Sequence, residues 1–207
     1  MKRAGIFLAL LFAAGCGGTK VLVAPRIDLR PYEVIGMIPF ESSSKGPLAQ
    51  LATVKFKEAL RADQGVVRIL DLGTEAELLT AVGGQRLDRE TLRAIGKKYD
   101  VRTVIRGSLI VSDVRPGVSL VPGLKFASIS AEVDATLQAD LIETSTGASL
   151  WNKEVSQTHK LGEVSFFGGK NVSFDARDPE RAYGAMVGDL VYALTPDFRA
   201  RWERRND

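Results

Sequence analysis

The chain has 207 residues, a formal net charge of +3 and a single cysteine. One cysteine excludes internal disulfides, and the length suits one domain with its own hydrophobic core. Two of the positive charges, Lys2 and Arg3, lie in an N-terminal segment that we expect to be removed, which leaves a nearly neutral body. Because nucleic-acid binding needs a clustered basic surface, we expect no nucleic-acid partner.

The N-terminal segment has the residue order of a secretory signal peptide. Its basic start is followed by an apolar run, Ile6 to Phe12, and then by small residues that lead to Cys16. The apolar run is shorter than the roughly 20 residues that a transmembrane helix needs. The segment therefore predicts export, with residues 1–15 removed.

Cys16 follows Ala13-Ala14-Gly15, and this order resembles a bacterial lipobox. The resemblance implies that the sulfur is diacylated, that the chain is cut before Cys16 and that the new amine is acylated as well. Two or more acyl chains anchor a protein stably, whereas one chain binds only marginally. By the same resemblance, Gly17 in place of aspartate favours the outer membrane, with the body on the periplasmic face. The alternatives are retention at the inner membrane and an ordinary secreted protein with an incidental cysteine.

The first half of the body predicts strands that alternate with helices. After a short coil over 17–26, a continuous apolar run with β-branched residues indicates a buried strand. Apolar spacing with a period near 3.6 then indicates an amphipathic helix that begins near Pro47. In chain order we expect a strand at 32–40, a helix at 47–63, a strand at 66–71, helices at 74–82 and 88–99, and a strand at 101–111.

The second half predicts a hairpin and a covering helix. Pro-Gly breakers make 111–130 a loop or an irregular hairpin, whereas residues 132–141 alternate between polar and apolar like a half-buried antiparallel strand. The remaining expected elements are a turn at 145–148, a strand at 149–156, a loop at 161–174, a helix at 178–196 and a last short helix at 197–205.

Three short motifs resemble those of a broad class of bacterial envelope proteins. Val34 to Glu41 is similar to the opening "IAVLPFE" strand of the class, Gly107-Ser108 to a strand end that reads "GS", and Glu143 to Trp151 to a turn that reads "D-x-x-T-G-x-x-x-W". The class includes the N-terminal domain of the Tol-Pal translocation protein, the lipoprotein activators of penicillin-binding proteins and the curli secretion lipoprotein. The resemblance covers Tyr32 to Val155 and the C-terminal helix, with Glu143 in place of the usual aspartate.

The order of these elements, together with the resemblance, predicts an α+β (α/β-like) fold. It should contain a mixed β-sheet with packed helices, including a C-terminal antiparallel hairpin and a covering helix. The expected organisation is a lipoprotein signal peptide at 1–15, a lipidated N-terminus and short linker at 16–31, a single α/β domain at 32–196 and a basic C-terminal tail at 197–207. We also expect Thr146-Gly147 to serve turn geometry and Trp151 to fill the edge of the core.

No residue pattern predicts catalysis. His159 is the single histidine of the chain, so it cannot combine with a second one. Ser42 and Lys45 have the separation of a nucleophilic Ser-x-x-Lys motif but lack the further partners that this chemistry needs. The most prominent carboxylates lie on the polar side of one strand, where solvation explains them: Glu132, Asp134 and Asp140. We therefore expect no enzyme, no cofactor and no metal site.

The expected function is that of a membrane-tethered lipoprotein that binds another envelope component, a protein or a glycan. The membrane itself is a partner through the acyl chains on Cys16, and a homo-oligomer is a further option. Apolar residues in breaker-rich loops either pack back on the core or face a partner. The candidate partner-binding residues are Val118, Leu120, Leu124, Phe126, Phe166 and Phe167.

The alternative function is an oligomeric outer-membrane secretion pore of the curli-lipoprotein type. Such a pore needs membrane-spanning strands of about 9–11 residues. The segments available for them are 111–130 and 158–174, which are interrupted by Pro-Gly and Gly-Gly pairs. The sequence therefore favours the binding protein over the pore.

Overall fold

The structure is a computed structural model that describes residues 19–44, 46–65, 67–112, 115–120, 127–161 and 179–205. The helices are α1 (Leu48–Gln64), α2 (Glu75–Val82), α3 (Arg89–Tyr99) and α4 (Pro179–Leu194), with short 3-10 helices η1 (Arg30–Tyr32) and η2 (Pro196–Phe198). The strands are β1 (Thr19–Val23), β2 (Val34–Met37), β3 (Glu41–Ser42), β4 (Arg68–Asp71), β5 (Thr103–Val111), β6 (Arg115–Leu120), β7 (Ala127–Glu143), β8 (Ser149–Leu161) and β9 (Arg201–Arg205).

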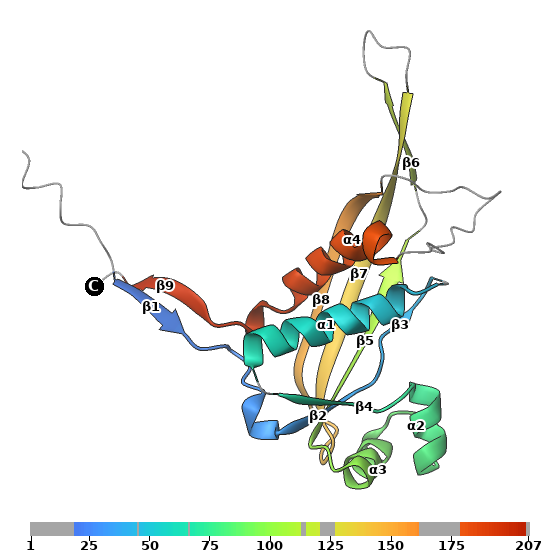
Figure 1. The fold of residues 1–207 in the computed structure, drawn as a ribbon. Coiled ribbons are helices and arrows are strands. Elements are labelled where there is room, and N and C mark those ends of the chain that lie inside the picture. Colours follow the sequence, from blue (N-terminus) through green and yellow to red (C-terminus); the bar gives the residue numbers. More distant parts are fainter. Residues whose placement is uncertain are drawn as a thin grey trace, which may run out of the picture.

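These strands form two sheets. β1 and β9 make a two-stranded ribbon, and the larger sheet has the order β4-β2-β5-β7-β6, with β3 also paired to β5 and β8 also paired to β7. β2 is parallel to β4 and β5, whereas β5, β6 and β8 run antiparallel to β7. α1 and α4 lie side by side over one face of the larger sheet (Figure 1). The α+β fold class expected from the sequence is confirmed.

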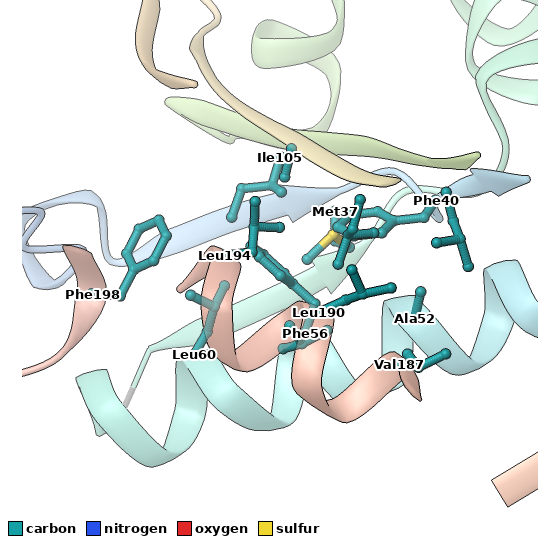
Figure 2. Close-up of a cluster of buried hydrophobic side chains, with 14 of the residues drawn as sticks. Met37, Phe40, Ala52, Phe56, Leu60, Ile105, Val187, Leu190, Leu194 and Phe198 are labelled. Carbon is teal, nitrogen blue, oxygen red and sulfur yellow. The ribbon is translucent and has the colours of Figure 1, made fainter. Parts of the chain in front are cut away.

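The main core lies between the larger sheet and the α1–α4 pair. Successive residues of a strand point to opposite faces, so alternate residues of β7 from Val133 to Leu141 face the helices and are fully buried. Figure 2 shows Phe56 of α1 and Leu190 of α4 meeting Met37 of β2. A smaller cluster fixes α2 and α3 over one end of the opposite face, around Val104.

Four aromatic rings form a row through the main core. The ring centroids of Phe40 and Phe56 are 5.2 Å apart, those of Phe56 and Phe198 6.4 Å, and those of Trp151 and Phe198 4.7 Å. The Nε1–H of Trp151 donates to Oδ2 of Asp197 at 3.1 Å, and the residue is only 8% exposed. Trp151 therefore fills the edge of the core, as predicted.

Local signals set the starts of α2 and α3. The backbone N–H of Thr74 donates to the Glu77 carboxylate at 2.8 Å, and the backbone N–H of Thr91 donates to Asp88 at 3.0 Å. These backbone hydrogen bonds lower the pKa of Glu77 and the pKa of Asp88 below their usual values. Both carboxylates therefore favour the folded chain at neutral pH, and this contribution is lost as the pH falls through the lowered pKa values.

The two ends of the described chain differ from the expectation. Residues 19–23 were expected as coil but form β1, and residues 201–205 were expected as helix but form β9, so both expectations are wrong. The two strands pair in register, with Thr19 opposite Arg205 and Val23 opposite Arg201. This pairing joins segments from opposite ends of the sequence. The spacing of apolar residues within either segment does not indicate that the other segment is its partner.

The sequence predicts either a loop or an irregular hairpin at 111–130, and the described residues of this segment form a hairpin. β6 pairs with the first part of β7, from Arg115 opposite Glu132 to Leu120 opposite Ala127. β7 and β8 are both longer than expected, because β8 pairs with β7 from Ala131 to Ile142 and the first part of β7 also pairs with β6. The loop expected at 161–174 lies outside the described residues except for Leu161, the last residue of β8.

Gln64, the last residue of α1, holds both chain ends against the body. Its Oε1 accepts from the N–H of Leu29 at 2.9 Å, and its Nε2 donates to the carbonyl groups of Ile27 at 3.0 Å and of Phe198. The N–H of Ile27 in turn donates to the carbonyl of Asp197 at 2.9 Å. The segments that connect to β1 and β9 are therefore fixed next to each other.

Replacing Gln64 with alanine should lower the free energy of unfolding by about 1–3 kcal/mol, because buried backbone groups lose their partners. Chemical denaturation of the wild type and the variant measures the difference. Gln85→Ala is the matched control, since Gln85 is exposed, and it should change stability by less than about 0.5 kcal/mol. Equal stability of the two variants would contradict the role given to Gln64.

Candidate functional site

One face of the antiparallel part of the larger sheet carries no helix among the described residues over most of its length. Because α1 and α4 cover the odd-numbered residues of β5, β7 and β8, the even-numbered ones face the other way. We call this surface the open face. Its residues are Arg106, Ser108 and Ile110 of β5, Glu132, Asp134, Thr136, Gln138 and Asp140 of β7, and Asn152, Glu154, Ser156, Thr158 and Lys160 of β8.

Cross-strand hydrogen bonds order the side chains of the open face. The hydroxyl groups of Thr136 and Ser156 lie 2.7 Å apart, and the Thr158 hydroxyl donates to Asp134 at 2.6 Å. Near one end, Asn152 donates to Asp140. Such pairs between directly opposed residues stabilise a sheet. The open face is thus a polar surface whose side chains are already held in place, with Ile110 as its one apolar residue, 53% exposed.

A cleft of about 180 Å³ lies at one end of the open face. It lies beyond the carboxyl end of β2. The helices that connect the neighbouring strands pass over one face of the sheet on one side of β2 and over the opposite face on the other side. The chain leaves β2 through α1 to reach β4, and it returns through α2 and α3 to reach β5 on the other side of β2. Crevices at such switch points are frequent ligand sites in open α/β sheets. The lining residues are Ile38, Pro39, Glu41, Glu75, Arg106, Gly107, Ser108, Gln138 and Asp140.

The side chains of this switch-point cleft offer charges of both signs. The Nε of Arg106 lies 3.7 Å from the Asp140 carboxylate, and Glu41 and Glu75 supply two further carboxylates. Gly107 also lines the cleft, but a Cβ there would point to the helix side of the sheet, 2.5 Å from the Gln138 carbonyl oxygen and 2.8 Å from the Phe40 ring, so the position has no room for a side chain. The cleft is smaller than the 300–1,000 Å³ or so of a drug-sized ligand pocket, so it suits one small polar group.

The structure describes two of the six candidate partner-binding residues, and these two do not line the cleft. Val118 and Leu120 belong to β6, where they pair with Ile129 and Ala127 of β7, away from the cleft. The others lie outside the described residues, as does the lipidation site Cys16: Leu124, Phe126, Phe166 and Phe167. The switch-point cleft therefore adds a site to those expected from the sequence.

The Thr146-Gly147 turn has the structural role that the sequence predicted. Gly147 has a φ of 73°, a left-handed conformation that favours glycine, and its N–H donates to the Glu143 carbonyl at 2.8 Å. The Thr146 hydroxyl donates to the Glu143 carboxylate at 2.5 Å and accepts from the N–H of Ala148 at 3.1 Å. These bonds close the hairpin between β7 and β8, and both the backbone and the side chain of Glu143 take part in them.

The sequence pattern does not predict that Arg106, Ser108 and Gln138 meet in a cleft. The alternation of polar and apolar residues in β7 predicts which of its side chains are on the polar side. It does not predict which strands lie next to β7, because that depends on the topology of the sheet. The available signal was Gly107-Ser108 directly after Arg106, since a glycine inside a strand marks a close approach of other chain segments.

The helices and the metal-ligating types of side chain in the described residues bear on two general features, a membrane-spanning helix and a metal site. None of the helices there is long and apolar enough to cross a membrane. In the same part of the chain, no group of three or more histidine, cysteine, aspartate or glutamate side chains has a metal-binding arrangement.

No protein-family model and no curated protein sequence matches this chain. Among solved structures, the fold is similar to the PelC dodecamer from Paraburkholderia phytofirmans, with 14% identity, a TM-score of 0.45 and coverage of 89% of this chain and 99% of that one. The LpoB C-terminal domain from Salmonella enterica is 16% identical, with a TM-score of 0.39 and coverage of 72% and 90%.

The lipoprotein GNA1162 from Neisseria meningitidis is 14% identical, with a TM-score of 0.40 and coverage of 77% of this chain and 93% of that one. At these identities and scores, the likeness concerns the arrangement of helices and strands. It assigns neither partners nor an activity to this chain.

Proposed function

We propose that this protein is a lipid-anchored periplasmic protein that binds another envelope component through its open face, without catalysis. The observation that carries the proposal is the switch-point cleft at the end of that face, where Arg106, Gln138 and Asp140 offer both charges and an amide to a polar group. The cross-strand hydrogen bonds hold the neighbouring side chains before a partner arrives, which reduces the entropy lost on binding. A protein or a glycan rich in hydrogen-bonding groups fits this surface.

Binding without catalysis is supported by the side chains that line the cleft. Ser108 supplies a hydroxyl, but the lining contains no histidine or cysteine that would activate it or act in its place. His159 is opposite Val133 in the register, so it faces the helix side of the sheet rather than the open face. The cleft therefore offers hydrogen bonds and charge to a partner.

The proposed anchor is Cys16, and Gly17 favours the outer membrane over the inner one. Only Gly17 and Gly18 separate Cys16 from Thr19, the first residue of β1, so a lipidated Cys16 would hold the folded body close to the membrane surface. The partner would then lie within the periplasm or on the same membrane.

Replacing Ile110 with arginine should reduce recovery of the partner from crosslinked host membranes by about tenfold or more, because an unpaired charge in an interface costs about 2 kcal/mol or more. Mass spectrometry of material purified with the tagged protein measures the recovery. Val54→Arg is the matched control, since Val54 is a similarly exposed apolar residue, 39% exposed, on α1.

The control should recover the partner as the wild type does. Equal recovery with both variants would contradict binding through the open face. A ring of this chain with no other partner would contradict the proposal and favour the secretion-pore alternative.

A further inference from the structure

The β1–β9 ribbon has two chemically different faces. In an antiparallel pair, directly opposite residues lie on the same face, and Lys20 is opposite Arg204 while Leu22 is opposite Trp202. One face therefore carries two cations and two apolar side chains and no carboxylate. The other face contains the acid of the ribbon, Glu203, which accepts from Arg201 at 2.6 Å.

The face with Leu22 and Trp202 is not covered by any other part of the chain that the structure describes. Leu22 is 53% exposed and Trp202 is 67% exposed, so they are among the most exposed large apolar side chains of the described residues. Figure 1 shows the ribbon projecting away from the helices and the larger sheet. A two-stranded ribbon is only marginally stable in water by itself, so contact along one face would stabilise it.

The ribbon is joined to the body by contacts at its base. Arg26 lies 3.9 Å from Asp197, and the N–H of Ile27 donates to the Asp197 carbonyl. Gln64 then holds the same two segments to the end of α1. Because of these contacts, any surface that binds the ribbon also fixes the orientation of the body.

The sequence determines how far the ribbon can lie from the proposed lipid anchor. Only Gly17 and Gly18 separate Cys16 from Thr19, so a fully extended chain places the start of β1 within about 11 Å of the acylated residue. The Lys20–Arg204 pair is next to that end of the ribbon. Tryptophan prefers the membrane–water interface, and lysine and arginine are attracted to anionic headgroups.

We propose that the face formed by Lys20, Leu22, Trp202 and Arg204 binds the surface of the membrane that holds Cys16. This inference rests on the proposed lipid anchor. The Trp202 indole and Leu22 enter the headgroup region, while the two cations contact lipid phosphates. The ribbon then acts as a second, reversible contact that orients the body and its open face relative to the membrane.

Tryptophan fluorescence of the full-length lipidated protein tests this inference. The protein is reconstituted into vesicles of phosphatidylethanolamine and phosphatidylglycerol that contain brominated phosphatidylcholine as a quencher. The chain has two tryptophans, and Trp202→Phe leaves only the buried Trp151. The difference between the wild type and this variant reports Trp202 alone.

We expect the Trp202 emission to be quenched by the brominated lipid, shifted to shorter wavelength, and less sensitive to aqueous acrylamide in vesicles than in detergent. Trp202 that stays open to acrylamide and is not quenched by lipid would overturn the inference. Protection from both quenchers would overturn it as well, since protein would then cover the ribbon. Protein that does not float with the vesicles lacks the anchor, which overturns the proposed function together with this inference.

A pair of charge variants tests which face is involved. Arg204→Gln removes a cation from the lipid-binding face, and Arg201→Gln removes one from the opposite face. The first should reduce the quenching by brominated lipid, and the second should leave it unchanged. Equal effects of the two variants would overturn the assignment of the face.

Discussion

Replacing Phe56 with alanine should lower the free energy of unfolding by about 3–5 kcal/mol, the usual range for a buried phenylalanine. Phe56 is fully buried at the centre of the aromatic row, with its ring between those of Phe40 and Phe198. The substitution leaves a cavity where α1, β2 and the C-terminal segment meet. Urea denaturation, followed by circular dichroism, measures the change.

Val54→Ala, on the exposed side of the same helix, is the control for helix propensity. It should shift stability by no more than about 0.5 kcal/mol, which is typical of surface substitutions. A Phe56→Ala protein within that range would show that the aromatic row is not the centre of the core.

Replacing Cys16 with serine, behind a signal peptide that is cut without acylation, should move the protein from the membrane fraction to the soluble fraction. Serine has no thiol to accept the diacyl group, and each methylene of a buried acyl chain contributes about 0.8 kcal/mol to membrane affinity. Fractionation of host cells, with detection of the tagged protein, measures the distribution. Gly17→Ser is the matched control, since it introduces the same side chain one residue later and keeps the thiol.

The Cys16→Ser protein should unfold at the same denaturant concentration as the wild type, because serine differs from cysteine by a single atom and the main core is built from Leu29 onward. A variant that stays with the membrane after a high-salt wash would contradict the acyl anchor. It would also mean that the ribbon or a membrane protein is sufficient to hold the chain.

The elements of the larger sheet and the helices over it follow from local physics. The apolar spacing of α1, the capping residue Asp88 of α3 and the strict alternation of β7 are each visible within about ten residues of sequence. The β1–β9 ribbon is different, because each strand acquires its hydrogen bonds from a partner at the other end of the chain. Neither strand has an apolar period of its own.

The candidate site also contains one part that local sequence predicts and one part that it does not. The polar residues of β7 were recognised, but their neighbours Arg106 and Ser156 join them only through the antiparallel register. The switch-point cleft depends on the sheet order β4-β2-β5, which differs from the order of these strands along the chain, β2, β4 and β5. The sequence carries these residues without indicating that they meet.

A photo-crosslinking amino acid at Ser156, on the open face, tests the central claim most directly. The matched position is Glu58 on α1, which is also exposed. In membranes of the native host, irradiation should join the Ser156 position to another envelope component, identified by mass spectrometry, and should give no such product at Glu58. Products only from Glu58, or only between copies of this chain, would contradict binding through the open face.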